Sequence, residues 1–270
     1  MENKVSEFAK YIRRMAAKMA LSAGNAGCHI GGSFSCIEIF AVLYGEVLKY
    51  DIANPKWENR DRFIPSKTHC ILSNFSALAK AGFIKENDLY SFHDNGGLLA
   101  GHPWNIDIGL EYSGGSLGMG LSVGIGMALA AKLSNYTYKT YVLIGDGESN
   151  EGSIWEAMMS ASHYKLDNLI AIIDYNNMQF DGIGNDIMSL ESLKSKTEAF
   201  GWKTVEVCGH DTKALSDAFQ TDHKGKPLMI IAKTIKAHGV PDLENTPESH
   251  HAVMKQSSYD AIIQQIDNEG

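Results

Sequence analysis

The stretch LIGDGESNEG, residues 143–152, places a single carboxylate, Asp146, between two glycines at the end of an apolar run. A second apolar run, LIAIIDYNN (169–177), also ends in oxygen-bearing side chains, and Asn176 lies 30 positions after Asp146. Each run has the length and composition of a buried strand, and a helical pattern follows each one. Buried strands that alternate with helices predict a parallel sheet covered on both faces.

The same alternation continues through the second half of the chain. We expect strands over 139–144, 169–174, 203–208 and 227–234, helices over 151–165, 190–200 and 212–222, and a loop over 176–189. In the mainly helical first part we expect helices over 3–21, 36–48 and 69–81, a glycine-rich turn over 23–34, a short strand over 61–66, and a Gly/Ser loop passing into a helix over 113–135. These elements predict an α/β fold with an open, mostly parallel sheet, in a single domain over 1–270.

Composition excludes several classes of function. The chain has 270 residues, 44% of them apolar, and a net charge of -8 without a basic stripe, so we expect no nucleic-acid partner. No apolar run approaches the roughly 20 residues that span a bilayer, so we expect no membrane partner. The four cysteines form no CxxC pair, which favours a reducing compartment and a cytoplasmic location. Lysines and arginines are not clustered, so a phosphate ligand is expected to be held by backbone amides, histidines or a metal.

The two polar strand ends are expected to meet, because ligands of open parallel sheets bind beyond the carboxyl ends of the strands. Asp146 offers an anionic oxygen and Asn176 a carbonyl oxygen, which are the ligands that Mg²⁺ prefers. The flanking glycines allow the backbone to approach a diphosphate, and the helix that follows directs its amide-rich N-terminus to the same place. Alone, Asp-Gly is also a common turn pair and Asp a common helix cap, but the pair of strand ends favours a metal–diphosphate site.

The surroundings of these strand ends resemble the amino-terminal half of transketolase. GDG followed some thirty residues later by Asn-Asn is similar to the thiamine diphosphate signature, and EGSIWEAMMSASHYKLDNLIAIIDYNNMQFDG (151–182) extends it. Further matches, in the family's order, are AGCHIGGSFSCIEIFAVLY (26–44), RDRFIPSKTHC (60–70), LAGHP (99–103), GGSLGMGLSVGIGMALA (114–130) and KTIKAHG (233–239). The resemblance covers roughly residues 5 to 255.

The resemblance implies a set of site residues. Asp146, Asn176 and the carbonyl of Met178 would hold Mg²⁺, or Ca²⁺ or Mn²⁺ in its place. Thiamine diphosphate would contact His69, Gly115, Ser116, Leu117, Asp146, Gly147, Glu151, Asn176 and Phe180. Glu151 would also belong to a carboxylate network at a subunit interface. His29, His69, His102 and His250 would line the substrate channel, with His251 as the alternative to His250.

The histidine assignment has a physical reason and an ordinary alternative. A random histidine is usually a surface residue or a satisfied polar group. His29, His69 and His102 differ because each lies in a turn or at a helix start beside a small residue. Neutral imidazole near pH 7 both donates and accepts protons, as ketose cleavage requires.

The chain also departs from the family pattern on the substrate side. Ile30 replaces a proline, Thr68 a glycine and Met119 a glutamine, and ESHHA (248–252) replaces the usual W-H-G. Gly120, Gly124 and Gly126 fall within a helix, where each costs about 1 kcal/mol relative to alanine. Either a close contact across a subunit boundary or a buried contact within the chain would explain them.

The functional expectation is the N-terminal subunit of a split transketolase. The pyrimidine-binding and C-terminal domains have no counterpart here, so a separate C-terminal subunit is expected to complete the sites, in an α2β2 assembly. The enzyme would move a two-carbon ketol unit from a ketose phosphate to an aldose phosphate. The alternatives are the α-subunit of a 2-oxo-acid dehydrogenase, a deoxyxylulose-phosphate synthase fragment, and a non-catalytic thiamine-diphosphate-binding subunit. HIGGSFS (29–35) and RDRFIPSKTH (60–69) disfavour the dehydrogenase subunit.

Overall fold

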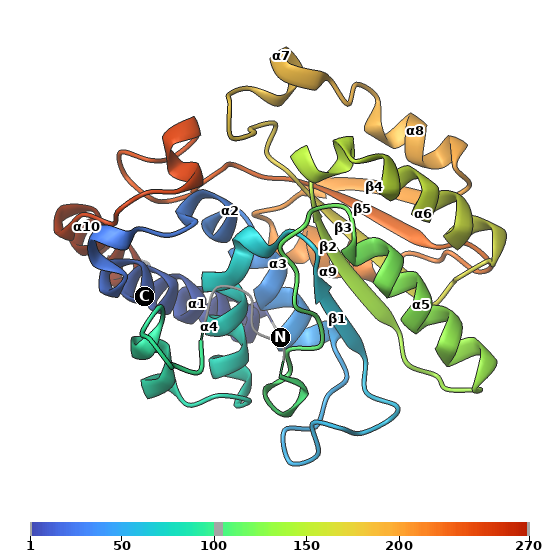
Figure 1. The fold of residues 1–270 in the computed structure, drawn as a ribbon, viewed down its shortest axis with the longest axis horizontal. Helices are drawn as coiled ribbons and strands as arrows, with labels where there is room; N and C mark the ends of the chain where they lie inside the picture. Colours follow the sequence, from blue (N-terminus) through green and yellow to red (C-terminus); the bar gives the residue numbers. More distant parts are fainter. Residues whose placement is uncertain (1, 100–104, 269–270) are drawn as a thin grey trace.

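The computed structural model describes residues 2–99 and 105–268 of the chain. Five strands form one open sheet in the order β1-β2-β3-β5-β4, and every neighbouring pair is parallel (Figure 1). Their bounds are β1 Arg62–Pro65, β2 Thr140–Gly145, β3 Leu169–Tyr175, β4 Lys203–Cys208 and β5 Leu228–Lys233. The predicted α/β class and parallel sheet are confirmed.

Helices cover both faces of the sheet (Figure 1). Their bounds are α1 Glu2–Ser22, α2 Ile30–Phe34, α3 Ile37–Val42, α4 Ile71–Ala81, α5 Gly120–Leu133, α6 Gly152–His163, α7 Gly184–Met188, α8 Leu193–Ala199, α9 Thr212–Phe219 and α10 Gln256–Asn268. Short 3-10 turns include Thr68–Cys70, Gly147–Asn150 and Pro247–His250. In the part of the chain that the structure describes, none of these helices has the length and apolar character to cross a bilayer.

Two apolar cores form because successive strand side chains point to opposite faces of the sheet. On β2, Tyr141 and Leu143 join the core under α1, α3, α4, α9 and α10. Val142 and Ile144 join the second core, under α5, α6 and α8. The central strands are therefore apolar on both faces. Burial on both faces explains why the sequences of these strands are almost continuously apolar. Polar groups are then found at the carboxyl ends of the strands.

The composition of the glycine-rich segment 23–34 predicted a turn, but the segment also contains a helix. Residues Ile30–Phe34 form helix α2, and the two glycines inside it are required by packing. A Cβ at Gly31 would lie 2.6 Å from the Ser249 hydroxyl oxygen, and one at Gly32 would lie 2.8 Å from the Cβ of His69. Close contacts with distant segments therefore explain these glycines, and α2 lies directly against the loops that carry two of the histidines.

Three other helical segments differ from what the sequence predicted. The helix expected over 36–48 is α-helical only in α3 and then widens into a π-helical turn over Leu43–Val47. The loop expected over 176–189 contains the short helix α7. The C-terminal helix α10 had not been anticipated. It packs on α1 and completes the first core through Ile262 and Ile266.

The glycines of α5 are explained in part by contacts inside the chain. A Cβ at Gly120 would lie 2.4 Å from the side chain of Ser66, and one at Gly124 would lie 2.5 Å from Val142 Cγ2. A Cβ at Gly126 would meet nothing within 4 Å. The first two glycines let α5 lie close to β1 and β2, and so fix the loop before α5 against the ends of those strands.

Candidate functional site

Four of the five strands deliver polar side chains to one cavity at the carboxyl edge of the sheet. The chain carries Lys67 and His69 just beyond β1, Asp146 beyond β2, Asn176 beyond β3 and Lys236 beyond β5. All five residues line a cavity of about 450 Å³. This volume lies within the usual range of small-molecule and cofactor sites. The ends of β2 and β3, which carry Asp146 and Asn176, therefore meet as the sequence predicts.

Most of the residues predicted for the site lie at this cavity. Those that line it are His69, Leu117, Asp146, Gly147, Glu151, Asn176, Met178, Phe180 and His250. Gly115 and Ser116 belong to the same loop as Leu117 but are exposed. His29 lies behind His69, with ring centroids 4.7 Å apart. His102 lies outside the described residues.

Asp146 caps a turn, as one interpretation of its sequence allowed, and it also lines the cavity. One carboxylate oxygen accepts a hydrogen bond of 2.8 Å from the Gly147 amide and caps the 3-10 turn Gly147–Asn150. The other oxygen accepts from the amide of Asn177, on the neighbouring strand end. Burial, assisted by the Asp174 carboxylate, raises the pKa of Asp146 to about 6. A carboxylate held in place but under-neutralised is well suited to a cation.

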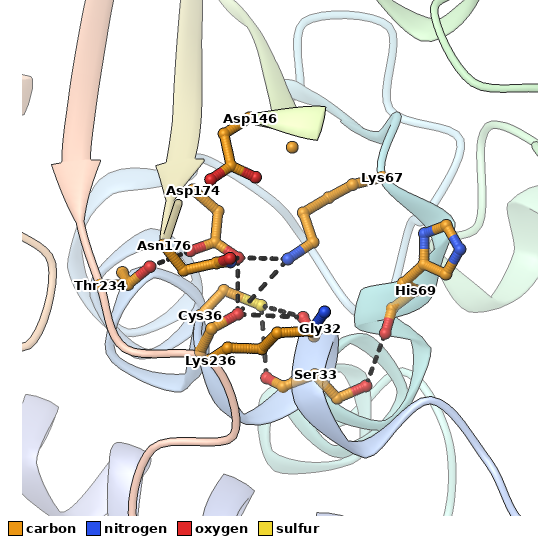
Figure 2. A network of polar contacts seen from close by, with 12 residues as sticks. Gly32, Ser33, Cys36, Lys67, His69, Asp146, Asp174, Asn176, Thr234 and Lys236 are labelled. Atoms are coloured by element: carbon orange, nitrogen blue, oxygen red, sulfur yellow. Dashed lines mark hydrogen bonds and ion pairs between the residues drawn. The ribbon is translucent and has the colours of Figure 1, made fainter. Parts of the chain in front are cut away.

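A buried ion pair lies directly beneath the two strand ends (Figure 2). Lys67 donates to Asp174, the last buried residue of β3. Burial alone would raise the pKa of Asp174 and lower that of Lys67. Their mutual attraction and their hydrogen bonds together outweigh burial, so the Asp174 pKa lies below its usual range and the Lys67 pKa above. Both groups are therefore charged.

The ion pair also orients the amide of Asn176. Asp174 accepts hydrogen bonds from Ser35 and Thr234. The Asn176 Nδ2 lies 3.5 Å from one of the Asp174 oxygens (Figure 2). The Nδ2 donor is thereby drawn toward Asp174. The Oδ1 atom is kept as an acceptor on the other side, where it receives the Met178 amide at 3.0 Å.

Lys236 is a site residue that sequence reasoning missed. Its ammonium group lies 3.1 Å from the Gln179 carbonyl and 3.5 Å from the Met178 carbonyl. Burial and the charge of Lys67 lower its pKa to about 8. The absence of lysine clustering in the sequence thus does not extend to the fold, because Lys67 and Lys236 both line this cavity. The two lysines are 169 positions apart in the sequence and come together only in the fold.

Glu148 is a second residue that the sequence analysis passed over, although it lies inside the GDGES motif. Its side chain is buried and accepts hydrogen bonds from the Gly118 amide at 2.8 Å and the Gly145 amide at 3.0 Å, as well as from Ser66. Burial raises its pKa above the usual range. Glu148 thus ties the GGSLG loop to the end of β2.

The imidazoles form a second group of residues at the cavity, where His69 and His250 line the wall and His29 packs against both. His29 precedes α2, His69 lies in the turn Thr68–Cys70, and His250 ends the turn Pro247–His250. The ring of His69 lies 4.9 Å from that of His250, which also contacts the exposed ring of Phe180 at 5.1 Å. Burial, together with the charges of Lys236 and Lys67, lowers the pKa of His250 to about 4. His250 is therefore neutral near pH 7.

The donor set fits a hard divalent cation on one side of the cavity. The carboxylate of Asp146, the amide oxygen of Asn176 and the carbonyl of Met178 are all oxygen donors at one end of the sheet. The ammonium group of Lys236 already lies against the Met178 carbonyl, which shows that this carbonyl faces positive charge in the cavity. The GDG backbone and the first turn of α6 lie beside them, where amide groups favour a diphosphate.

Comparison with known proteins identifies the family. Residues 5–268 match the family model described as "Transketolase, thiamine diphosphate binding domain". The chain is 41% identical to an apulose-4-phosphate transketolase subunit of Phocaeicola vulgatus, over 88% of this chain and 85% of the relative. It is 39% identical to a 6-deoxy-6-sulfo-D-fructose transketolase subunit of Clostridium sp., over 90% and 89% respectively. The chain belongs to the transketolase family.

Solved structures agree with this assignment. The transketolase of Campylobacter jejuni superposes with a TM-score of 0.91 at 31% identity, over 98% of this chain and 43% of that one. The transketolase of Leishmania mexicana superposes with a TM-score of 0.87 at 30% identity, over 97% and 41%. The chain thus spans about two fifths of these solved chains. The predicted family and enzyme class are confirmed, and the dehydrogenase alternative is not favoured.

Proposed function

We propose that this chain is the N-terminal, cofactor-binding subunit of a two-subunit transketolase that acts in the cytoplasm. The enzyme moves a two-carbon ketol unit from a ketose phosphate, or a related anionic ketose, to an aldose phosphate. The observation that carries the proposal is the convergence of four strand ends on one cavity, with oxygen donors on one side and imidazoles on the other. Thiamine diphosphate, when bound, supplies the carbon centre that attacks the ketose carbonyl.

The oxygen side is proposed to hold the diphosphate through Mg²⁺. Asp146, Asn176 and the Met178 carbonyl are the proposed ligands, and Gly147 lets the backbone approach the phosphates. Lys236 adds positive charge to the same end of the cavity. Burial and the charge of Lys67 lower the pKa of Lys236 to about 8, and a nearby anion favours its protonated form.

The imidazole side is proposed to receive the sugar. His69 and His250 line the cavity directly, and His29 packs against both. A neutral imidazole can accept the proton of a sugar hydroxyl as its carbon–carbon bond breaks and return it to the acceptor sugar. His102 is proposed to join this group, as the family resemblance implies. Leu117 and Phe180 supply apolar surface for the cofactor rings, beside Gly115 and Ser116.

A separate C-terminal subunit is proposed to complete the site, in an α2β2 assembly. Two relatives of similar length carry the word subunit in their names, which supports a partner chain. Glu151 is exposed at the start of α6 and lines the cavity, as a residue facing a partner would. We propose that its carboxylate belongs to a network at the subunit interface. The two relatives' names contain a sugar phosphate and a sulfo-sugar, which supports anionic sugars as substrates.

The test is calorimetric titration of thiamine diphosphate with Mg²⁺ into the chain, with and without the product of an adjacent gene resembling a transketolase C-terminal half. Ketol transfer should be measured in the same mixtures with several ketose phosphates. Tight binding and transfer only in the mixture would support a two-chain transketolase. Binding without transfer for every sugar tried would contradict the substrate class. Absence of binding in both mixtures would contradict the proposed metal–diphosphate site.

A further inference from the structure

Two histidines that line the cavity form a compact cluster of nitrogen donors with a third that lies behind them. His29, His69 and His250 each offer a ring nitrogen, and these three nitrogens all lie within 4.8 Å of one another. The ring centroids are 4.7, 4.9 and 5.5 Å apart. The three side chains are only half-buried, and the cluster opens on the cavity of about 450 Å³. An ion entering the cavity therefore meets His69 and His250 at its wall, and the ring of His29 contacts both of them.

We propose that His29, His69 and His250 together bind a divalent transition-metal ion such as Zn²⁺, at a site distinct from the oxygen donors of Asp146 and Asn176. Imidazole nitrogen is a preferred ligand of Zn²⁺, Ni²⁺ and Cu²⁺ but a poor one for Mg²⁺. The two sides of one cavity thus differ in the class of cation that they select.

The spacing of the rings suits such an ion after a small adjustment. With Zn–N bonds of about 2.0–2.1 Å, two nitrogens of a tetrahedral site lie about 3.4 Å apart. Each ring has to move by roughly 1 Å or less from nitrogens 4.8 Å apart to reach that distance. Imidazole has two nitrogens, so one can bind the ion while the other keeps a hydrogen-bond partner. Water from the cavity would take the fourth position, as in open zinc sites.

The position of the cluster gives the bound ion a consequence. These imidazoles are the groups proposed to receive the sugar, so an ion held by them would exclude the substrate. This consequence rests on the proposed function, whereas the binding of the ion does not. We therefore expect Zn²⁺ to inhibit the two-chain enzyme in competition with the ketose, and to do so without displacing Mg²⁺.

Equilibrium dialysis of the full chain against Zn²⁺ tests the site without any assay of activity. We expect one high-affinity ion per chain, undiminished by millimolar Mg²⁺. The variants His69→Ala and His250→Ala should each weaken Zn²⁺ binding at least about tenfold, since even the loss of an outer partner of a ligand costs 10–100-fold. His163→Ala and His223→Ala are matched controls, because neither histidine is buried and neither lines the cavity. They should leave the affinity unchanged.

The variant Asp146→Ala tests whether Zn²⁺ binds at the imidazoles or at the oxygen donors. It should leave Zn²⁺ affinity within about twofold of the original chain, because it removes no imidazole. Equal Zn²⁺ affinity in the original chain and in the folded His69→Ala and His250→Ala variants would overturn the proposal. So would loss of Zn²⁺ binding in Asp146→Ala. Folding of each variant is checked by urea unfolding.

Two further measurements do not depend on a variant. Co²⁺ added to the original chain should give the visible absorption of a four-coordinate, nitrogen-ligated ion, and a spectrum of octahedral Co²⁺ alone would contradict the site. In the two-chain enzyme, inhibition by Zn²⁺ should be relieved by more ketose and by a chelator. Relief by added Mg²⁺ instead would place Zn²⁺ on the oxygen side and overturn the proposal. If transfer activity is never found, the dialysis and Co²⁺ results still decide the metal site.

Discussion

The two sides of the cavity are built on different kinds of structure. The oxygen side grows from the ends of β2 and β3, whose side chains are fixed by the Lys67–Asp174 pair and by backbone amides. The imidazole side comes from a helix start and two 3-10 turns, and the His29 ring contacts those of His69 and His250 edge to face. Binding a diphosphate needs fixed geometry, whereas passing protons to different sugars tolerates side chains that adjust. The difference matches the roles proposed for the two sides.

The largest effect is expected from the scaffold beneath the oxygen side. Asp174→Ala leaves Lys67 charged and buried without its partner, so the free energy of unfolding should fall by about 3–5 kcal/mol. Asp167→Ala removes the same type of pair from the surface, with Lys132, and should cost less than about 1 kcal/mol. Urea unfolding of both variants measures the difference. Equal losses in the free energy of unfolding would mean that the buried pair stabilises the fold no more than the surface pair does.

Loss of the proposed metal ligand should spare the fold but not the cofactor. Asp146→Ala should weaken Mg²⁺-dependent binding of thiamine diphosphate by about 100-fold, because a metal site that loses its anionic ligand keeps only neutral oxygens. Calorimetry measures the affinity, and far-ultraviolet circular dichroism checks the fold. Unchanged cofactor affinity would remove Asp146 from the metal site and with it the main distinction between the two sides.

Substitution of an imidazole should reduce turnover and leave cofactor affinity nearly unchanged. His250→Ala should lower the turnover of the two-chain enzyme by about 10- to 100-fold, at or below the lower end of the roughly 100- to 10,000-fold range for general acid–base catalysis, because neighbouring histidines remain. Cofactor affinity should change by less than about threefold. The family resemblance leads us to expect the same pattern for His102→Ala. A variant that binds the cofactor poorly yet turns over normally once saturated would contradict the division between the sides.

The smallest effect is a pH dependence of cofactor binding. The pKa of Asp146 is raised to about 6 in the metal-free chain, so its charged form is disfavoured there. Its contribution to folding stability therefore becomes less favourable as the pH rises from about 4 to 6. Metal binding requires the charged form and must release the proton below pH 6.

Affinity for Mg²⁺ and thiamine diphosphate should accordingly be about fourfold weaker at pH 5.5 than at pH 7.5, the loss expected for one proton with a pKa of about 6. Calorimetry in two buffers measures the affinity and the protons released, after subtraction of the protons that Mg²⁺ and the cofactor exchange without protein. Asp146→Ala is the control and should release no proton from this group. Stronger binding at pH 5.5 would reverse the expected sign and contradict the assignment.

Much of the fold followed from local sequence patterns. Strand β2 was expected over 139–144 and found over Thr140–Gly145, because a run buried on both faces has few alternatives to a central strand. The short helices α2 and α7 were missed. Their residues are glycine-rich or polar, and α2 is held by contacts with segments far away in the chain, as the closeness of Gly32 to His69 illustrates. Periodicity carries no information about such contacts.

By itself, the sequence determined the parallel α/β architecture and the pairing of Asp146 with Asn176, because strand ends and their spacing are local features. The family resemblance added the histidines. Tertiary structure alone decided how the site is charged. Lys67 and Asp174 are 107 positions apart, Ser66 and Glu148 are 82 apart, and Lys236 reaches the Met178 carbonyl across 58 positions. A buried charge needs an opposite charge beside it. Which residue supplies that charge depends on which strand ends lie next to each other at the edge of the sheet.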